Sequence, residues 1–250
     1  MTLQKRTIWI GYDPPQLDAF LVARSSIEKY LKWQIPVRAL ILSDLQEQGA
    51  YTRPMRNGVA TAHGFQLHDV ISDAPMSTEF SISRFLTPIL AGEGLALYMD
   101  CDMLVRGDIH VLFDQIDLRK AVSCVKHEHI AKASSKMDNR LQVNYPRKNW
   151  SSLMVFNCDH PANDRLTLEM VNSIPGRDLH AFCWLKDEEI GSLDPAWNYL
   201  VNVTKDVDNP HIAHFTEGTP TNRGPLRGEL AEDLADEWKE TLLEWVRNER

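Results

Sequence analysis

The sequence predicts an α/β fold in which a Rossmann-like, mostly parallel sheet is flanked by helices. The β-branched apolar run Thr7–Gly11 predicts a first buried strand. Apolar residues at helical spacing over Gln16–Trp33 predict a helix, and Val37–Leu42 predicts a second strand. A strand, a helix and a strand in this order are typical of parallel α/β proteins. The apolar run Leu95–Met99 predicts a further buried strand.

The rest of the chain continues this alternation. We expect loops with short elements over residues 43–78, and a long polar connection of functional character over residues 127–148. Further strands are expected at Ala121–Lys126 and Ser152–Asn157, and helices at Phe80–Leu90, Leu166–Ser173 and Trp184–Leu193. From Glu229 onward, apolar residues recur on one helical face opposite acidic ones, which predicts an amphipathic C-terminal helix.

Composition narrows the class of protein. With 250 residues, the chain is long enough for one full α/β domain, and we expect a single domain over residues 1–250. A net charge of -8, with no Lys/Arg run longer than a pair, argues against polymeric nucleic acid as a partner. Without a membrane span or a signal-peptide core, and with four widely spaced cysteines, the chain is expected to be cytoplasmic with reduced thiols.

Two carboxylates follow the strand at Leu95–Met99. Asp100 and Asp102 are two residues apart, so on an extended chain both side chains point to the same side and can face one cation. Carboxylate oxygens suit Mg²⁺ or Mn²⁺, whose remaining positions diphosphate oxygens can fill. A second such pair, Asp206 and Asp208, precedes Asn209-Pro210 in an expected solvated turn, and we assign it no role.

Residues 97–108, which contain this pair, resemble the metal-binding core of the family 8 glycosyltransferases, retaining enzymes of the GT-A fold. Small bacterial and phage glycosyltransferase-like proteins are more similar still. Further segments resemble the family in the family's order, so the match spans most of residues 7–225: Ile8–Asp13, Ile82–Phe85, Trp150–Asn157, Asp187–Asn198 and His214–Gly218.

The resemblance implies a retaining transfer of sugar from a nucleoside-diphosphate donor, a uridine nucleotide in most of the family, to an acceptor that the sequence does not identify. We expect a nucleotide-binding half at residues 7–110 and a sugar and acceptor half at residues 111–225, followed by the amphipathic helix at residues 229–250. The resemblance also implies that the Mn²⁺ or Mg²⁺ ligands are Asp100, Asp102 and His214. The implied donor-binding residues are Tyr12, Asp13, Arg84, Ser151, Gly218 and Arg223, and the implied catalytic residues beside the anomeric carbon are Asp187 and Glu188.

The chain departs from the family pattern at two places. The family has Gly three residues and Lys six residues after its His, whereas this chain has Gly218 and Pro220 at four and six residues after His214. Arg223 is the candidate replacement for that lysine. Glu188 stands where the family usually has an amide, a change that bears on the mechanism.

Structural interpretations remain open for several of these residues. His214 follows an apolar pair and could be a core histidine, and Arg84 could pair with Glu79 or lie on a solvated helix face. Asp100 and Asp102 could cap a nearby helix or bridge to an Arg, and Asp187–Glu189 could be a helix start favoured by the helix dipole. His127 and His129 have the spacing of zinc ligands, but no convincing third and fourth ligand follows, which favours a loop on the acceptor side. The basic residues of that loop would suit an anionic acceptor: Lys126, Lys136, Arg147 and Lys148.

Two other functions compete. Haloacid-dehalogenase-like phosphatases also use a strand followed by Asp-x-Asp, but they need Thr or Val where this chain has Leu104, and a downstream acidic motif that is absent. A non-catalytic protein that binds a nucleotide sugar is the third class, and binding without transfer would identify it.

Overall fold

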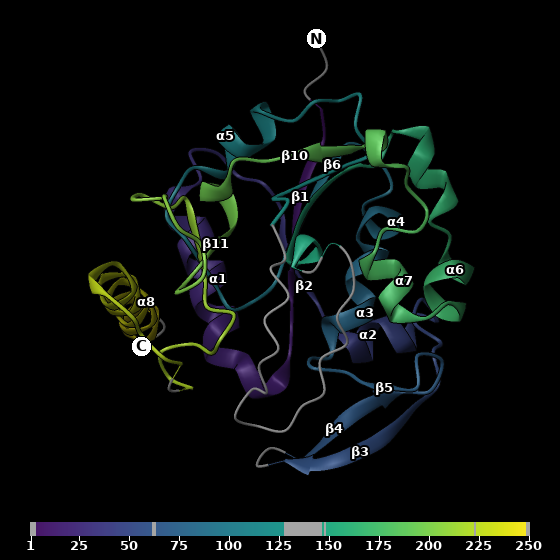
Figure 1. Ribbon diagram of the computed structural model, residues 1–250, viewed down its shortest axis with the longest axis horizontal. Coiled ribbons are helices and arrows are strands. Elements are labelled where there is room, and N and C mark those ends of the chain that lie inside the picture. Colours follow the sequence, from purple (N-terminus) through teal and green to yellow (C-terminus); the bar gives the residue numbers. More distant parts are fainter. Residues whose placement is uncertain (1–3, 62–63, 128–146, 148, 223, 249–250) are drawn as a thin grey trace.

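A six-stranded sheet forms the centre of the molecule (Figure 1). The computed structural model describes residues 4–61, 64–127, 147, 149–222 and 224–248. In spatial order the strands are β10 (Ile190–Ser192), β8 (Val122–Cys124), β9 (Leu153–Asn157), β6 (Leu95–Met99), β1 (Arg6–Gly11) and β2 (Val37–Leu40). All of them run in one direction except β9, which is antiparallel to both of its neighbours. The predicted mostly parallel α/β sheet is therefore confirmed.

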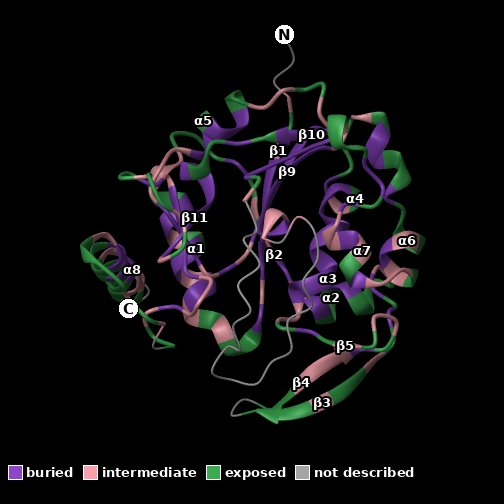
Figure 2. Cartoon of the chain, viewed as in Figure 1, coloured by how far each residue is buried: buried purple, intermediate pink, exposed green. Residues whose placement is uncertain are grey.

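Helices cover both faces of this sheet, with α1 and α8 on one side and α3, α4, α6 and α7 on the other (Figure 1). The inner strands β6, β8 and β9 are fully buried, while the edge strand β2 is partly exposed (Figure 2). The helices are α1 (Leu17–Tyr30), α2 (Leu42–Glu47), α3 (Phe80–Ser83), α4 (Thr87–Ala91), α5 (Ile109–Asp114), α6 (Leu168–Ser173), α7 (Gly176–His180) and α8 (Glu229–Asn248). Short 3₁₀ turns lie at Pro14–Gln16, Arg84–Leu86, Trp150–Ser152, Pro161–Arg165, Asp187–Glu189 and Pro195–Asn198.

A second, three-stranded sheet extends from the end of β6. Its order is β11 (Tyr199–Leu200), β12 (Ile212–His214) and β7 (Met103–Val105). Strand β7 begins directly after Asp102, and β12 pairs antiparallel with it so that His214 lies opposite Met103. This pairing brings His214 to the carboxylates from more than a hundred residues away in the sequence.

A third sheet, β3 (Met55–Thr61), β4 (Gly64–Asp69) and β5 (Ala74–Pro75), forms an arm at the rim of the molecule. Much of its surface is exposed (Figure 2). Its base is fixed by Arg53, whose guanidinium bonds both carboxylate oxygens of Asp69 and the backbone carbonyls of Val171 and Ile174. The arm is therefore joined to the helical layer by the hydrogen bonds of Arg53, whose guanidinium is itself held by a buried ion pair with Asp69.

Two expected elements differ from the structure. Residues 43–78, expected to be loops with short elements, contain α2 and the three-stranded arm. The helix predicted at Trp184–Leu193 is wrong, because residues 187–189 form a 3₁₀ turn and Ile190–Ser192 form β10. The free edge of β8 pairs with this segment, and those long-range hydrogen bonds override its local helical spacing.

Among the residues that the structure describes, no helix is both long and apolar enough to cross a membrane.

Candidate metal centre and donor site

The candidate site lies at the carboxyl edge of the six-stranded sheet. Tyr12 and Asp13 follow β1, and Asp100 and Asp102 follow β6. Ser151 lies at the same edge because β9 runs in the opposite direction and begins there. Open α/β sheets bind their ligands at this edge, because the loops that leave the strands converge there.

Asp100, Asp102 and His214 form one cluster. Each offers a ligand atom, and these atoms all lie within 4.8 Å of one another. His214 is 3% exposed, and its Nε2 lies 3.2 Å from Oδ1 of Asp102. His214 is thus buried, yet it faces a carboxylate rather than the apolar core, which separates it from an ordinary core histidine.

One oxygen of Asp100 is occupied by protein groups. Its Oδ1 accepts a 2.7 Å hydrogen bond from the Tyr98 hydroxyl and lies 2.9 Å from a terminal guanidinium nitrogen of Arg84. Burial raises the pKa of Asp100, although the positive charge of Arg84 acts to lower it. Because these contacts are all on Oδ1, Oδ2 is the oxygen that remains for a cation.

A chain of hydrogen bonds fixes the tautomer of His214. The Ser152 hydroxyl donates to the Asn149 carbonyl at 2.7 Å, and it accepts from Asn198 Nδ2 at 2.9 Å. The carbonyl oxygen of the Asn198 amide therefore faces His214 Nδ1 at 2.9 Å. Nδ1 must carry a proton to donate to that oxygen, so the neutral ring presents the Nε2 lone pair to the carboxylates.

The chemistry of these side chains fits a divalent cation. Within the part of the chain that the structure describes, Asp102 Oδ1 is buried, and its one close polar neighbour is Nε2 of His214 at 3.2 Å, which forms an ion pair with it only when the ring is protonated. A buried carboxylate oxygen left in this way is unfavourable unless a cation or a donor reaches it. Burial by itself would lower the pKa of His214, but the charges of Asp102 and Asp100 raise it. Two oxygens and one imidazole nitrogen suit Mn²⁺, and Mg²⁺ less closely.

Asn198 is expected to support metal binding without contacting the metal. We expect Asn198→Ala to weaken Mn²⁺ binding by about 10- to 100-fold, because His214 loses the group that fixes its tautomer. Titration calorimetry with Mn²⁺ measures this change. Asn198→Asp, which keeps an acceptor for Nδ1, should restore most of the affinity, and Asn209→Ala at an exposed turn should have no effect. Unchanged affinity in a folded Asn198→Ala variant would contradict the assignment.

Arg84 and Asp13 are placed at the site but are held by protein partners. Arg84 does not pair with Glu79 as the structural interpretation expected; it bridges Asp100 and the Ser151 carbonyl, which lies 2.9 Å from its guanidinium. Asp13 is 7% exposed, and its oxygens accept from the Glu79 amide and the Gln16 side chain. Tyr12 is half-buried and packs edge-on against Phe20.

The loop after β12 contains the remaining expected donor contacts. Gly218 lies four residues after His214, with a φ of 120° that a side chain would strain. Gly224 packs so closely on Gly218 that a Cβ there would come 1.8 Å from its carbonyl oxygen. Arg223, between them, lies outside the described residues, as do His129, Lys136 and Lys148.

Asp187 and Glu188 are not brought to this site. Strand β10 lies three strands from β6, a lateral separation of about 14 Å at ordinary strand spacing. Both residues precede β10, and the register places Ile190 level with the amino end of β6. Glu188 is exposed with its carbonyl bonded by Lys120, and Asp187 is exposed and paired with Arg147. The sheet register therefore does not place Asp187 and Glu188 at the metal centre, although the family resemblance implies that they lie beside the reacting carbon.

The sequence interpretation did not assign Tyr98, Ser152 or Asn198 to the site. Tyr98 and Ser152 both lie within strands that the sequence predicts. The one sequence signal for Tyr98 is that it is a polar side chain two residues before Asp100. His127 was considered for zinc; its Nε2 is buried without a hydrogen-bond partner among the described residues. Burial, together with the nearby His214, lowers the pKa of His127 to about 4, so the ring is neutral.

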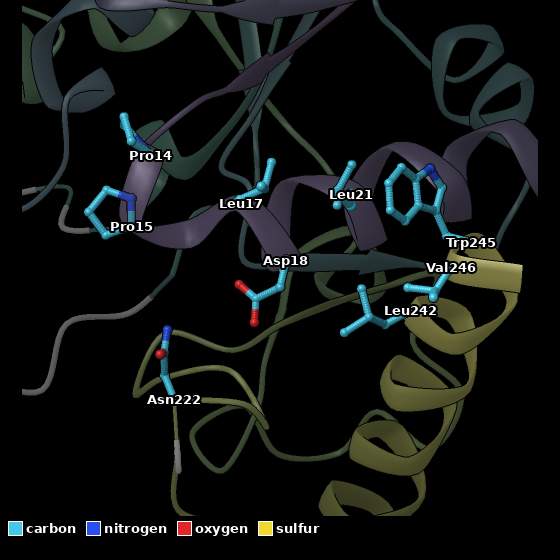
Figure 3. Close-up of a pocket in the computed structure, with 9 residues that line it drawn as sticks. All are labelled: Pro14, Pro15, Leu17, Asp18, Leu21, Asn222, Leu242, Trp245 and Val246. Carbon is cyan, nitrogen blue, oxygen red and sulfur yellow. The ribbon is translucent and has the colours of Figure 1, made fainter. Parts of the chain in front are cut away.

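An apolar groove lies apart from these residues, between α1 and α8 (Figure 3). Its volume is about 350 Å³, and it is lined by Pro14, Pro15, Leu17, Asp18, Leu21, Asn222, Leu242, Trp245 and Val246. It contains no basic residue and none of the expected donor contacts, so it is a poor candidate for a diphosphate.

Comparison with known proteins gives relatives by sequence and by fold. No protein-family model matches the chain. Protein CDI of Arabidopsis thaliana is 41% identical over 219 residues, which are 85% of this chain and 78% of that protein.

Two solved structures share the fold at low identity. The glycosyltransferase GlyE of Streptococcus pneumoniae TIGR4 is 15% identical with a TM-score of 0.54, over 98% of this chain and 64% of GlyE. The galactosyltransferase LgtC, solved with donor and acceptor sugar analogs, is 12% identical with a TM-score of 0.54, over 94% of this chain and 95% of LgtC. This chain thus spans less than two thirds of GlyE but nearly all of LgtC. The expected GT-A fold is confirmed, and the chain belongs to the same family as Protein CDI.

Proposed function

We propose that this protein is a metal-dependent glycosyltransferase that moves a sugar from a nucleoside-diphosphate donor, a uridine nucleotide, to an acceptor hydroxyl group. The observation that carries the proposal is the cluster of Asp100, Asp102 and His214, whose ligand atoms lie within 4.8 Å of one another at the ligand-binding edge of a GT-A fold. LgtC, which has this fold, was solved with donor and acceptor sugar analogs. That complex supports a sugar donor and a sugar-like acceptor as the partners of this chain.

Asp100 Oδ2, an oxygen of Asp102 and Nε2 of His214 would hold Mn²⁺ or Mg²⁺. A divalent cation at this position neutralises the charge that develops on the leaving diphosphate. Asn198 accepts from Nδ1 of His214, so the lone pair of the neutral ring is on Nε2, the nitrogen that would bind the metal. Tyr98 keeps Asp100 in one orientation, because its hydroxyl donates to Oδ1.

The donor would lie along the carboxyl edge of the sheet. Tyr12 and Asp13 at the end of β1 are proposed to contact the nucleoside, and Gly218 and Arg223 the diphosphate. Arg84 is already paired with Asp100 and is proposed to add positive charge next to the phosphates. In this arrangement residues 7–110 supply the nucleotide contacts, and residues 111–225 supply the sugar and acceptor contacts.

Binding of nucleotides tests the proposal directly. Calorimetry with UDP, GDP, ADP and CDP, each with and without Mn²⁺, is expected to show one nucleotide, UDP, whose binding requires the metal. Incubation of the matching sugar nucleotides with simple sugar acceptors should then release UDP, with the anomeric configuration retained by NMR. If none of the four nucleotides binds under either condition, the donor site is not where we propose.

A further inference from the structure

The β12–α8 loop (residues 215–222 and 224–227) returns on itself before α8 begins. Its first residue donates a backbone N–H to the Asp102 carbonyl at 2.9 Å, so the loop starts at a proposed metal ligand. Its two limbs then touch at Gly218 and Gly224, where a Cβ on Gly224 would lie 1.8 Å from the Gly218 carbonyl oxygen. The loop is therefore closed on itself next to the candidate metal centre.

The side chain of Asn202 bonds both limbs of this loop. Its Nδ2 donates to Oε2 of Glu217 at 3.1 Å and to the Pro225 carbonyl at 2.8 Å. Its Oδ1 accepts the backbone N–H of Arg227 at 2.9 Å. The guanidinium of Arg227 also pairs with the same oxygen of Glu217, at 2.9 Å. One amide thus joins the outgoing limb, one residue before Gly218, to the returning limb.

The partners of Asn202 fix the orientation of its amide. A carboxylate and a peptide carbonyl only accept hydrogen bonds, and a peptide N–H only donates. Nδ2 must therefore face Glu217 and Pro225, and Oδ1 must face Arg227, since the reverse orientation would lose all three bonds. Aspartate, which has the same shape, could keep only the bond from Arg227.

The backbone of Asn202 is itself held close to the metal centre. The preceding residue, Val201, donates its N–H to the His214 carbonyl at 3.0 Å. Thr204 closes the turn, because its N–H donates to the Leu200 carbonyl at 2.9 Å. Asn202 has a φ of 67°, in the left-handed region that asparagine adopts more readily than most residues. Asn202 therefore ties the β12–α8 loop to the sheet that presents His214.

We propose that Asn202 is a positioning residue that holds the β12–α8 loop in its ligand-binding shape before the donor arrives. The inference rests on the proposed function, in which Gly218 of this loop contacts the diphosphate. A loop that is already ordered loses little conformational freedom when a ligand binds, so its contacts contribute more to affinity. Asn202 and Arg227 also bind the Glu217 carboxylate, which would otherwise be free to repel a diphosphate at Gly218.

Titration calorimetry in Mn²⁺ compares the native chain with Asn202→Gly, which removes the side chain without straining the left-handed backbone. We expect the nucleotide that the native chain binds, UDP, to bind about five- to tenfold more weakly, because binding must then order the loop. Mn²⁺ binding without nucleotide should be unchanged, since the three ligand side chains lie outside the loop. Asp206 is exposed with a φ of 60°, so Asp206→Gly is the matched control and should change neither affinity. Equal nucleotide affinity of the native chain and Asn202→Gly would overturn the proposal.

Two further variants test the bond between Asn202 and Glu217. Asn202→Asp should bind UDP at least as weakly as Asn202→Gly does, because it places a second carboxylate against Glu217. Asn202→Asp/Glu217→Gln exchanges the roles of the two side chains, since the glutamine amide can donate to the aspartate. This double variant should recover part of the loss, and no recovery would overturn the role of the bond.

Hydrogen exchange of the free chain separates this inference from the proposed function. The N–H groups of Gly218 and Asn222 donate to the carbonyls of Phe215 and Thr219 within the loop, at 2.9 and 3.0 Å. Both N–H groups should be protected in the native chain and should exchange faster in Asn202→Gly. Unchanged exchange would overturn the role of Asn202, whatever nucleotide binds. If the native chain binds none of the four nucleotides, the proposed function fails; faster exchange would then show that Asn202 holds the loop, while its role in donor binding would be overturned.

Discussion

Replacement of Asp100 and Asp102 by asparagine is expected to abolish Mn²⁺-dependent nucleotide binding and to reduce sugar transfer by about 10³-fold or more. Asparagine preserves the shape of each side chain and leaves an oxygen for Tyr98 and Arg84, but it removes both negative charges that hold the cation. A metal acting on a leaving group contributes several kcal/mol to the transition state, and each 1.36 kcal/mol is a tenfold change in rate. Calorimetry and release of UDP from its sugar nucleotides measure the two effects.

The chain contains a matched control for this variant. Asp206 and Asp208 repeat the Asp-x-Asp spacing, but both are exposed, and they lie in the turn before Asn209 and Pro210. The Asp206→Asn/Asp208→Asn variant removes the same charge and should bind nucleotide and transfer sugar as the native chain does. Transfer by the folded Asp100→Asn/Asp102→Asn variant at more than a tenth of the native rate would exclude the proposed metal centre.

Loss of the Arg53–Asp69 pair is expected to have the largest effect on stability. Both side chains are almost fully buried, and Arg53 also donates to the carbonyls of Val171 and Ile174. Arg53→Met leaves the Asp69 carboxylate buried without its cation, which should lower the free energy of unfolding by about 3–5 kcal/mol. Urea denaturation followed by circular dichroism measures this change.

An exposed pair in the same arm provides the control. Arg56 pairs with Asp73 at 3.2 Å, with their side chains 62% and 85% exposed. Arg56→Met should change the free energy of unfolding by less than about 1 kcal/mol, because exposed ion pairs are solvated and screened. Equal effects of the two variants would show that Arg53 does not anchor the arm.

The Arg53–Asp69 pair also makes the free energy of unfolding depend on pH. Burial acts to raise the pKa of Asp69, but the hydrogen bonds from Arg53 and Ser72 and the charge of Arg53 outweigh it, so the pKa is lowered. A carboxyl whose pKa is lower in the folded chain contributes stability above its unfolded value, about 3.9. We therefore expect this contribution to be intact above about pH 4 and to be lost as the pH falls through the folded pKa. Arg53→Met should lack this part of the acid dependence, which unfolding curves at several pH values would reveal.

The sequence by itself determined the parts of the fold that depend on local patterns. The runs at Thr7–Gly11 and Leu95–Met99 are apolar enough to specify buried strands, and both occur within one residue of the predicted ends. Position at the end of a buried strand also identified Asp100 and Asp102, because alternation along a strand puts both carboxylates on one side. Amphipathic spacing located α8 from its first residue, Glu229.

The family resemblance implied His214 as a third ligand, but only the tertiary structure decided how distant residues meet these carboxylates. His214 reaches Asp102 because β12 pairs with β7, and Asn198 reaches His214 through the turn before β11. The register of β10 instead separates Glu188 from the site, although its place in the sequence motif suggested otherwise. Strand order and register depend on pairing between segments far apart in the chain. Hydrophobic periodicity predicts that a segment is a strand, but it does not specify the strand with which that segment pairs. The chain's local patterns therefore specify the metal-binding carboxylates, while non-local strand pairing determines the groups that orient and complete the site.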